Sequence, residues 1–105
     1  MKDDEMIYAD RIRQWAADRN LISGSTPQAQ FVKLMEEVGE LAEAIAKKKH
    51  DQFEDSIGDV FVVLTILAAQ HGMEIEECIG YAWDEIKDRK GRMVDGVFVK
   101  EEDDG

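Results

Sequence analysis

The sequence predicts an all-α fold: an antiparallel four-helix bundle with a short C-terminal hairpin or extended tail, completed by oligomerisation. Four segments carry apolar residues at helical spacing, and short polar or glycine-containing stretches separate them. The third segment has no polar face in its second half, which is typical of a helix covered on all sides. A chain of 105 residues buries only a moderate share of its surface alone, so we expect a second copy to supply part of that cover.

Length and composition indicate one domain inside the cell. We take residues 1–105 as a single domain with frayed ends at about 1–4 and 100–105. The N-terminus lacks the apolar core of a signal peptide, and the longest apolar run, Val60–Ala69, is too short to span a bilayer. We therefore expect a cytoplasmic protein with no membrane partner.

The charge balance narrows the choice of ligand. The chain carries 24 acidic and 13 basic residues, for a net charge of −11. Nucleic-acid binding needs a basic surface against the phosphate backbone, so we expect no nucleic-acid partner. A nucleotide substrate is compatible with this charge if a divalent cation lies between protein carboxylates and phosphates.

The first two helices are predicted on either side of a break. Apolar residues recur at helical spacing over about residues 4–19, and the stretch NLISGSTP then interrupts the pattern. Ser25 or Thr26 can cap a second helix that starts at Pro27 and runs to about Lys48. One face of this helix is apolar, and it is formed by Leu34, Val38, Leu41, Ala42 and Ile45. The opposite face is charged and contains Lys33, Glu36, Glu40, Glu43 and Lys47.

Two further helices and a turn complete the predicted fold. The third helix covers about residues 52–71 and the fourth about 75–90, with Gly91 at its end. The final segment, RMVDGVFVK, places Asp95-Gly96 between short apolar runs, which is the signal for a hairpin with a type I′ turn. Two short strands are only marginally stable alone.

Three glutamates share one sector of the second helix. Glu36, Glu37 and Glu40 are related by three- and four-residue spacings, so their side chains point in similar directions. Taken on this helix alone, a solvated face with ion pairs to Lys33 and Lys47 explains them best.

The third helix changes that interpretation. Asp55 and Asp59 are four residues apart, and Asp59 opens a stretch that is otherwise apolar on every side. A buried carboxylate is costly unless it is paired or bound to a cation. A short connection makes the two helices antiparallel, which brings the two acidic turns to the same height. Ligation by oxygen alone favours Mg²⁺, Mn²⁺ or Ca²⁺ over zinc, and Mg²⁺ is the choice beside a phosphate.

These residues also carry a resemblance. KLMEEVGELAEAI followed by DSIGDVFVVL resembles the MazG-like nucleotide pyrophosphohydrolases of the all-α NTP pyrophosphatase superfamily, over about residues 15–92. The family pattern is EExxE, a spacer and ExxD. Glu36, Glu37 and Glu40 match EExxE, and Asp59 matches the final Asp. The sequence departs from the pattern at Ser56, where the family has Glu.

The departure concerns one ligand. Asp55 is the stand-in for the missing Glu, because positions three and four residues before Asp59 share a helix face; Glu54 is the alternative. The DRKG end and GVFVK tail look like the short, stand-alone members of phages and bacteria, so the cytoplasm in question is the host's if a phage encodes the chain.

The resemblance implies a Mg²⁺-dependent hydrolysis of an NTP or dNTP to the monophosphate and pyrophosphate, with Mn²⁺ as the alternative ion. It implies Glu37, Glu40, Asp55 and Asp59 as metal ligands, with Glu36 and Glu37 as catalytic residues. Glu36 would orient or deprotonate the water, and a surface ion pair with Lys33 explains it equally well. Substrate-binding residues would be Gln30, Lys33, Lys87 and Arg89. The expected assembly is a homodimer or homotetramer.

Two other functions fit the same residues. An enzyme of this fold could act on dUTP-like nucleotides or alarmones. A catalytically degenerate helical module that binds a partner protein would also be acidic and oligomeric, and the departure at Ser56 keeps this alternative open. Such a module would not need Asp59 at the start of a buried stretch.

Overall fold

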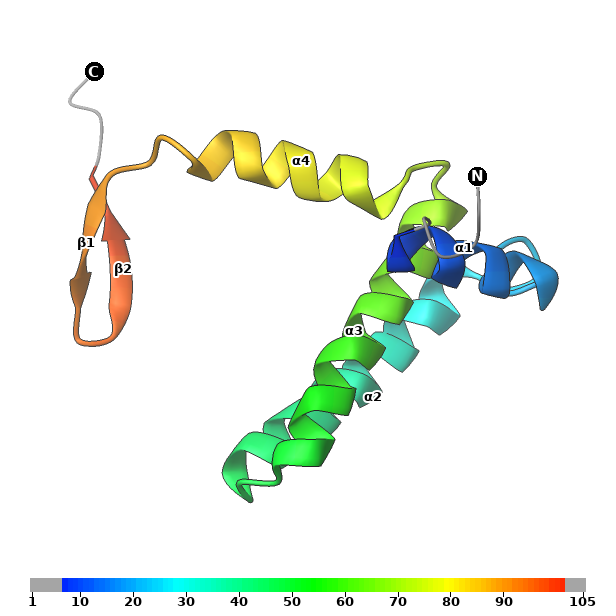
Figure 1. Cartoon of the computed structure of the whole chain (residues 1–105), viewed down its shortest axis with the longest axis horizontal. Helices are drawn as coiled ribbons and strands as arrows, with labels where there is room; N and C mark the ends of the chain where they lie inside the picture. Colours follow the sequence, from blue (N-terminus) through cyan, green and yellow to red (C-terminus); the bar gives the residue numbers. More distant parts are fainter. Residues whose placement is uncertain (1–6, 102–105) are drawn as a thin grey trace.

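A computed structural model describes residues 7–101 of the chain. It contains four helices followed by a two-stranded antiparallel hairpin, which confirms the predicted all-α class (Figure 1). The elements are α1 (Tyr8–Asp18), α2 (Pro27–Ala46), α3 (His50–Gln70), α4 (Ile75–Ile86), β1 (Gly91–Val94) and β2 (Val97–Lys100). The fraying expected at residues 1–4 lies outside the described residues, whereas Lys100, also expected to fray, pairs with Gly91 in the hairpin.

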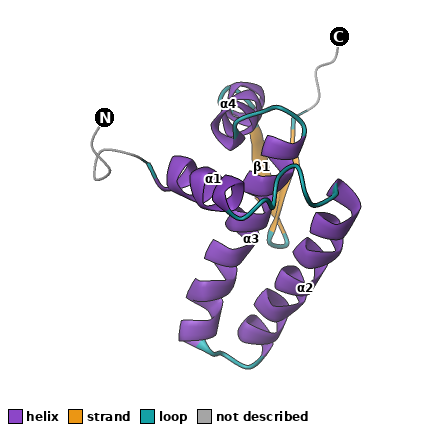
Figure 2. Cartoon of the chain, turned by 90° about the vertical axis from the view of Figure 1, so that its right-hand side faces the viewer, coloured by secondary structure: helices purple, strands orange, loops and turns teal. Residues whose placement is uncertain are grey.

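Helices α2 and α3 form an antiparallel hairpin joined by a short turn (Figure 2). The Thr26 Oγ1 accepts a hydrogen bond from the Ala29 N–H at 3.1 Å, and Pro27 occupies the first turn, so α2 starts as its sequence predicts. It ends two residues earlier than predicted, because Lys48 takes a left-handed φ of 56° that a helix cannot continue through.

Small side chains make up most of the core between α1, α2 and α3. The buried apolar residues are Ala9, Ala16, Ala44, Val63, Ile66, Ala68 and Ala69. Four of these seven lie on α3, which α1 crosses near its C-terminal half (Figure 1). The prediction that the second half of α3 is covered on every side holds only in part, since Leu64 is 37% exposed. We call α1, α2 and α3 the body.

Helix α4 and the β1–β2 hairpin project away from the body, and we call residues 75–100 the arm. The break between α3 and α4 turns the chain by 101°. No residue of α4 is buried, and every residue of the hairpin is exposed. At the hairpin tip, Asp95 and Gly96 have φ values of 52° and 82°, as the predicted type I′ turn requires.

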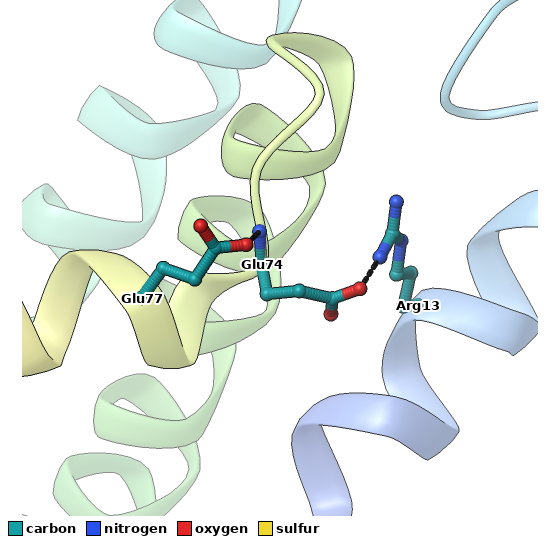
Figure 3. Close-up of polar contacts among 3 residues, drawn as sticks. All are labelled: Arg13, Glu74 and Glu77. Carbon is teal, nitrogen blue, oxygen red and sulfur yellow. Dashed lines mark hydrogen bonds and ion pairs between the residues drawn. The ribbon is translucent and has the colours of Figure 1, made fainter.

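Polar contacts among three residues hold the start of the arm against the body (Figure 3). Arg13 of α1 forms an ion pair with Glu74, the residue that precedes α4. The Glu74 N–H donates to the Glu77 Oε1 at 3.1 Å, which caps the first turn of α4. The direction in which the arm leaves the body is therefore tied to α1.

The helices of residues 7–101 were compared with the length and apolar composition that a membrane-spanning helix needs. No single helix among residues 7–101 is long and apolar enough to cross a bilayer. Helices α3 and α4 meet that criterion only together, across their bend.

Candidate metal centre

Glu37 is the buried carboxylate of the molecule's acidic cluster. The residue is only 5% exposed, because α2 packs against α3 at this point. Its Oε1 lies 3.2 Å from the Lys33 Nζ, one turn earlier on the same helix. Its Oε2 is buried and has no hydrogen-bond partner among the described residues. A buried carboxylate oxygen without a partner costs free energy, and a bound cation would remove that cost.

Glu40 and Asp59 converge on Glu37 from two helices. One carboxylate oxygen of each of the three residues lies within 4.8 Å of the others. Opposite ligands of one Mg²⁺ ion are about 4 Å apart, so small side-chain adjustments would let a single ion contact all three. The antiparallel α2–α3 hairpin thus brings the two acidic turns to the same height, as its short connection predicts.

The protonation of Asp59 reflects this crowding. Partial burial raises the pKa of Asp59 from its ordinary 3.8 to about 6, and the charges of Asp55 and Glu37 add to the shift. The closeness of the Asp55 and Glu37 carboxylates favours the protonated form of Asp59 in the same direction. In the absence of a cation, a shared proton relieves part of the repulsion in this cluster.

The structure places the residues that could supply a fourth ligand. Ser56, at the position of the family's Glu, is 1% exposed and enclosed by the packing of α3. Asp55 is exposed, and its carboxylate lies close enough to Asp59 to raise the pKa of that residue. Glu54 points to solvent, with its carboxylate 3.8 Å from the His50 Nε2. Of the two predicted stand-ins, Asp55 is therefore the one in contact with the cluster, although it lies outside the group of three that converges within 4.8 Å.

The remaining predicted residues of α2 lie beside the cluster. Glu36 is exposed, with its carboxylate 3.8 Å from the Lys33 Nζ. A hydrogen bond to Glu37 and the charge of that carboxylate raise the pKa of Lys33. Gln30 donates from its Nε2 to the Ser25 Oγ at 3.0 Å, so its amide is engaged with the loop before α2.

The two predicted phosphate-binding residues of the fourth helix lie elsewhere in the chain. Lys87 follows the end of α4, with its Nζ 3.3 Å from Asp84. Arg89 lines a cavity of about 470 Å³ between the end of α4 and the hairpin. One chain therefore unites Lys33 with the carboxylates but keeps Lys87 and Arg89 on the arm.

Sequence reasoning did not place α1 beside Asp59. Asp59 lies on the edge of a cavity of about 760 Å³ between α1 and α3, where Tyr8 and Ile12 form part of the wall. The spacing of Ile12 and Trp15 predicts an amphipathic helix, but no signal in the sequence says that this helix packs beside Asp59.

Comparison with known proteins gives the family. Residues 25–94 match the family of MazG nucleotide pyrophosphohydrolase domains, which is well over half of the chain. The chain belongs to the MazG family. The resemblance carried by the EExxE and IGDV segments is thereby confirmed, while α1 and β2 lie outside the matched residues.

A phage protein is similar to this MazG chain. It is the uncharacterized 18.2 kDa protein in the rep-hol intergenic region of Haemophilus phage HP1 (strain HP1c1), and the two sequences are 60% identical over 63 residues. The aligned segment covers 60% of this chain but only 39% of the phage protein. The chain thus spans well under two thirds of the length of this relative.

Proposed function

We propose that the protein is a Mg²⁺-dependent nucleoside triphosphate pyrophosphohydrolase, which converts an NTP or dNTP to the monophosphate and pyrophosphate. The observation that carries the proposal is the unpartnered, buried Oε2 of Glu37 within the Glu37–Glu40–Asp59 cluster. Membership of the MazG family supports a nucleotide as the substrate.

The donor set supports a hard divalent cation. The cluster offers carboxylate oxygens only, which suit Mg²⁺ or, in its place, Mn²⁺. Glu37, Glu40 and Asp59 would hold the ion, with Asp55 as a fourth ligand. When bound, the ion would neutralise the charge of the phosphate oxygens and lower the pKa of a coordinated water.

Two residues on the exposed side of α2 have roles in the proposed hydrolysis. Glu36 lies one residue before Glu37 and is free in solvent apart from its contact with Lys33, so it can orient the attacking water and accept its proton. The bond that breaks is the anhydride between the α and β phosphates, and pyrophosphate leaves. Lys33 remains positively charged beside these groups and can pair with a phosphate oxygen as charge develops there.

We also propose that the active enzyme is a homodimer or homotetramer. The support is the arm, whose α4 helix has an exposed apolar side with Ile79, Trp83 and Ile86. The arm also carries Lys87 and Arg89, which a single chain holds apart from the carboxylates. A second copy could bring these cations to the cluster, where a triphosphate needs them. We place this activity in the cytoplasm of the cell or, for a phage protein, of its host.

One assay tests the proposed activity. The purified protein is incubated with Mg²⁺ and a panel of NTPs and dNTPs, and pyrophosphate is detected. Release that stops on addition of EDTA is the expected result, and no release from any nucleotide would overturn the proposal. Including dUTP and an alarmone in the panel tests the alternative substrates, and activity confined to one of them would favour that reading instead.

A further inference from the structure

A hydrogen bond joins the first turn of α3 to the acidic turn of α2. The Gln52 Nε2 donates to the main-chain carbonyl of Glu40 at 3.1 Å, across a separation of 12 residues in the chain. The Lys33–Glu37 ion pair, by contrast, lies within α2. A contact within one helix does not determine how far that helix slides along its neighbour, whereas the contact between Gln52 and Glu40 does.

The carbonyl and the side chain of Glu40 point in opposite directions along α2. In an α-helix the carbonyl groups point toward the C-terminus, and the Cα–Cβ bonds tilt toward the N-terminus. The Glu40 carbonyl therefore points toward the α2–α3 turn, where Gln52 lies, and its side chain leans the other way, toward Asp59. Asp59 follows Gln52 by seven residues, which is about two helical turns, so both lie on the same side of α3.

Glu40 is the exposed member of the Glu37–Glu40–Asp59 cluster. Packing restrains Glu37, which is buried, and Asp59, which is half-buried. The Glu40 side chain has no comparable cover, so the position of its carboxylate relative to α3 depends on where the main chain of α2 lies. Gln52 holds that main chain at Glu40 itself.

The buried residues nearest to the α2–α3 turn are small. They are Ala44 of α2 and Ser56 of α3, and each is 1% exposed. Packed helices are kept in register by ridges of side chains that fit into grooves, and small side chains form shallow ridges. The hydrogen bond from Gln52 therefore adds a restraint on sliding where packing supplies little.

A displacement of Glu40 would affect two candidate ions unequally. Mg²⁺ needs nearly ideal octahedral geometry with ligands at about 2.0–2.1 Å, whereas Ca²⁺ accepts longer and more variable distances. An α-helix advances by about 1.5 Å per residue, so even a fraction of a one-residue slide moves a carboxylate by more than Mg²⁺ ligation tolerates. A fixed register of α2 against α3 therefore favours Mg²⁺ over Ca²⁺.

We propose that Gln52 is a positioning residue, which sets the register of Glu40 against Asp59 and makes the cluster selective for Mg²⁺ over Ca²⁺. The inference rests on the proposed function, since it assumes that the cluster holds a divalent cation. Gln52 acts through the main chain of Glu40 and needs no contact with the ion. It lies outside both acidic segments, so the spacing of the carboxylates alone does not reveal it.

The test uses replacements of Gln52 that keep a long, unbranched side chain but differ in hydrogen bonding. Gln52→Met has no donor and removes the contact with Glu40, and methionine is a good helix former, so the fold is retained. Gln52→Lys supplies a donor that can reach the same carbonyl. Gln28→Met is the matched control, because Gln28 is exposed and also lies in the first turn of a helix.

Calorimetric titrations with Mg²⁺ and with Ca²⁺, both without nucleotide, give the ratio of the two dissociation constants. Gln52→Met should weaken Mg²⁺ binding by about tenfold, as is usual when a group that orients a ligand is lost, and Ca²⁺ binding by no more than about twofold. The added charge of Gln52→Lys repels both divalent ions alike, so the ratio should return to that of the unchanged protein. Gln28→Met should leave both constants unchanged.

A second measurement follows the hydrogen bond itself. The ¹³C resonance of the Glu40 carbonyl should move in Gln52→Met and return toward its original position in Gln52→Lys, because carbonyl shielding responds to a donated hydrogen bond. A resonance that does not move in Gln52→Met would overturn the inference.

Equal weakening of both ions in Gln52→Met, or no weakening of either, would also overturn the inference while leaving the proposed function intact. A ratio that Gln52→Lys does not restore would do the same. Failure of the unchanged protein to bind either ion would instead overturn the metal site on which the proposed function depends.

Discussion

The body and the arm of this MazG protein are built by different means. In the body, α1, α2 and α3 bury alanine and valine side chains against one another and hold the carboxylates in place. In the arm, α4 has no buried residue and the hairpin is exposed along its whole length. Residues 87–100 contain five basic and two acidic side chains, so this part of the arm is locally basic in an acidic chain. The body also exposes large apolar side chains on α2, among them Val32 and Ile45 at 59% and 60%, so the two regions differ in degree: the body buries a small core, whereas the arm buries nothing.

The largest expected effect comes from substitutions in the carboxylate cluster of the body. Glu40→Gln and Asp59→Asn each remove a proposed ligand without changing its size, so pyrophosphate release should fall by at least about a hundredfold. Steady-state assays in Mg²⁺ measure this loss, and calorimetry should show weaker Mg²⁺ binding. Glu43→Gln is the matched control, because Glu43 lies on the same helix and pairs with Lys47 at 3.7 Å. Full activity in either cluster variant would remove these residues from the site.

The second prediction tests whether the arm of one copy completes the carboxylate site in the body of another copy. Glu40→Gln has an intact arm, and Lys87→Ala/Arg89→Ala has intact carboxylates. If a site combines the body of one copy with the arm of another, an equal mixture should recover at least about tenfold more activity than either variant alone. The mixture is prepared by unfolding and refolding the two proteins together. A mixture no more active than the sum of its parts would show that the arm does not act on a neighbouring site.

A smaller effect distinguishes the two candidates for the fourth ligand. Asp55→Asn should weaken Mg²⁺ binding by about tenfold, because Asp55 contacts Asp59 in the cluster. Glu54→Gln is the control, since its carboxylate lies beside His50 at 3.8 Å. Calorimetric titration with Mg²⁺ compares the two variants. The opposite ranking would move the fourth ligand to Glu54.

The smallest expected effect concerns the stability of the metal-free body. The folded state raises the pKa of Asp59 to about 6 from 3.8, so between these values the folded chain holds a proton that the unfolded chain has lost. The contribution of Asp59 to stability is therefore lost as pH rises from about 4 to 6, by on the order of 1 kcal/mol. Urea unfolding in EDTA at both ends of this range, with Asp59→Asn for comparison, measures it. The Asp59→Asn variant lacks this titration, so its free energy of unfolding should fall less between about pH 4 and pH 6 than that of the unchanged protein. The same fall in both proteins would contradict the assignment.

Sequence reasoning succeeded where neighbours along one helix, or across one short turn, decide the result. The spacing of Glu36, Glu37 and Glu40 and the short connection to α3 were enough to predict the convergence with Asp59. Asp95-Gly96 was enough to predict the turn of the hairpin. These features depend on local geometry that a few residues determine.

Other features depend on contacts between distant segments, which periodicity does not reveal. The apolar stripe on α4 predicts which side of the helix packs against other residues. It does not predict the bend of 101° between α3 and α4. The place of α1 beside Asp59 likewise follows from the packing of Ala16 and the ion pair of Arg13 with Glu74. Helical spacing was enough to prefer Asp55 over Glu54, because a residue four positions before Asp59 shares its helix face.

The hairpin at the end of the arm has a further consequence for handling the protein. Two strands pair only with each other, so each presents an outer row of backbone N–H and C=O groups that no third strand covers among residues 7–101. Such rows can template the addition of strands from other chains, and charged side chains such as Arg92 and Lys100 oppose that growth by repulsion. High salt screens this repulsion, so concentrated samples should be kept at low ionic strength if sheet-like aggregation is to be avoided.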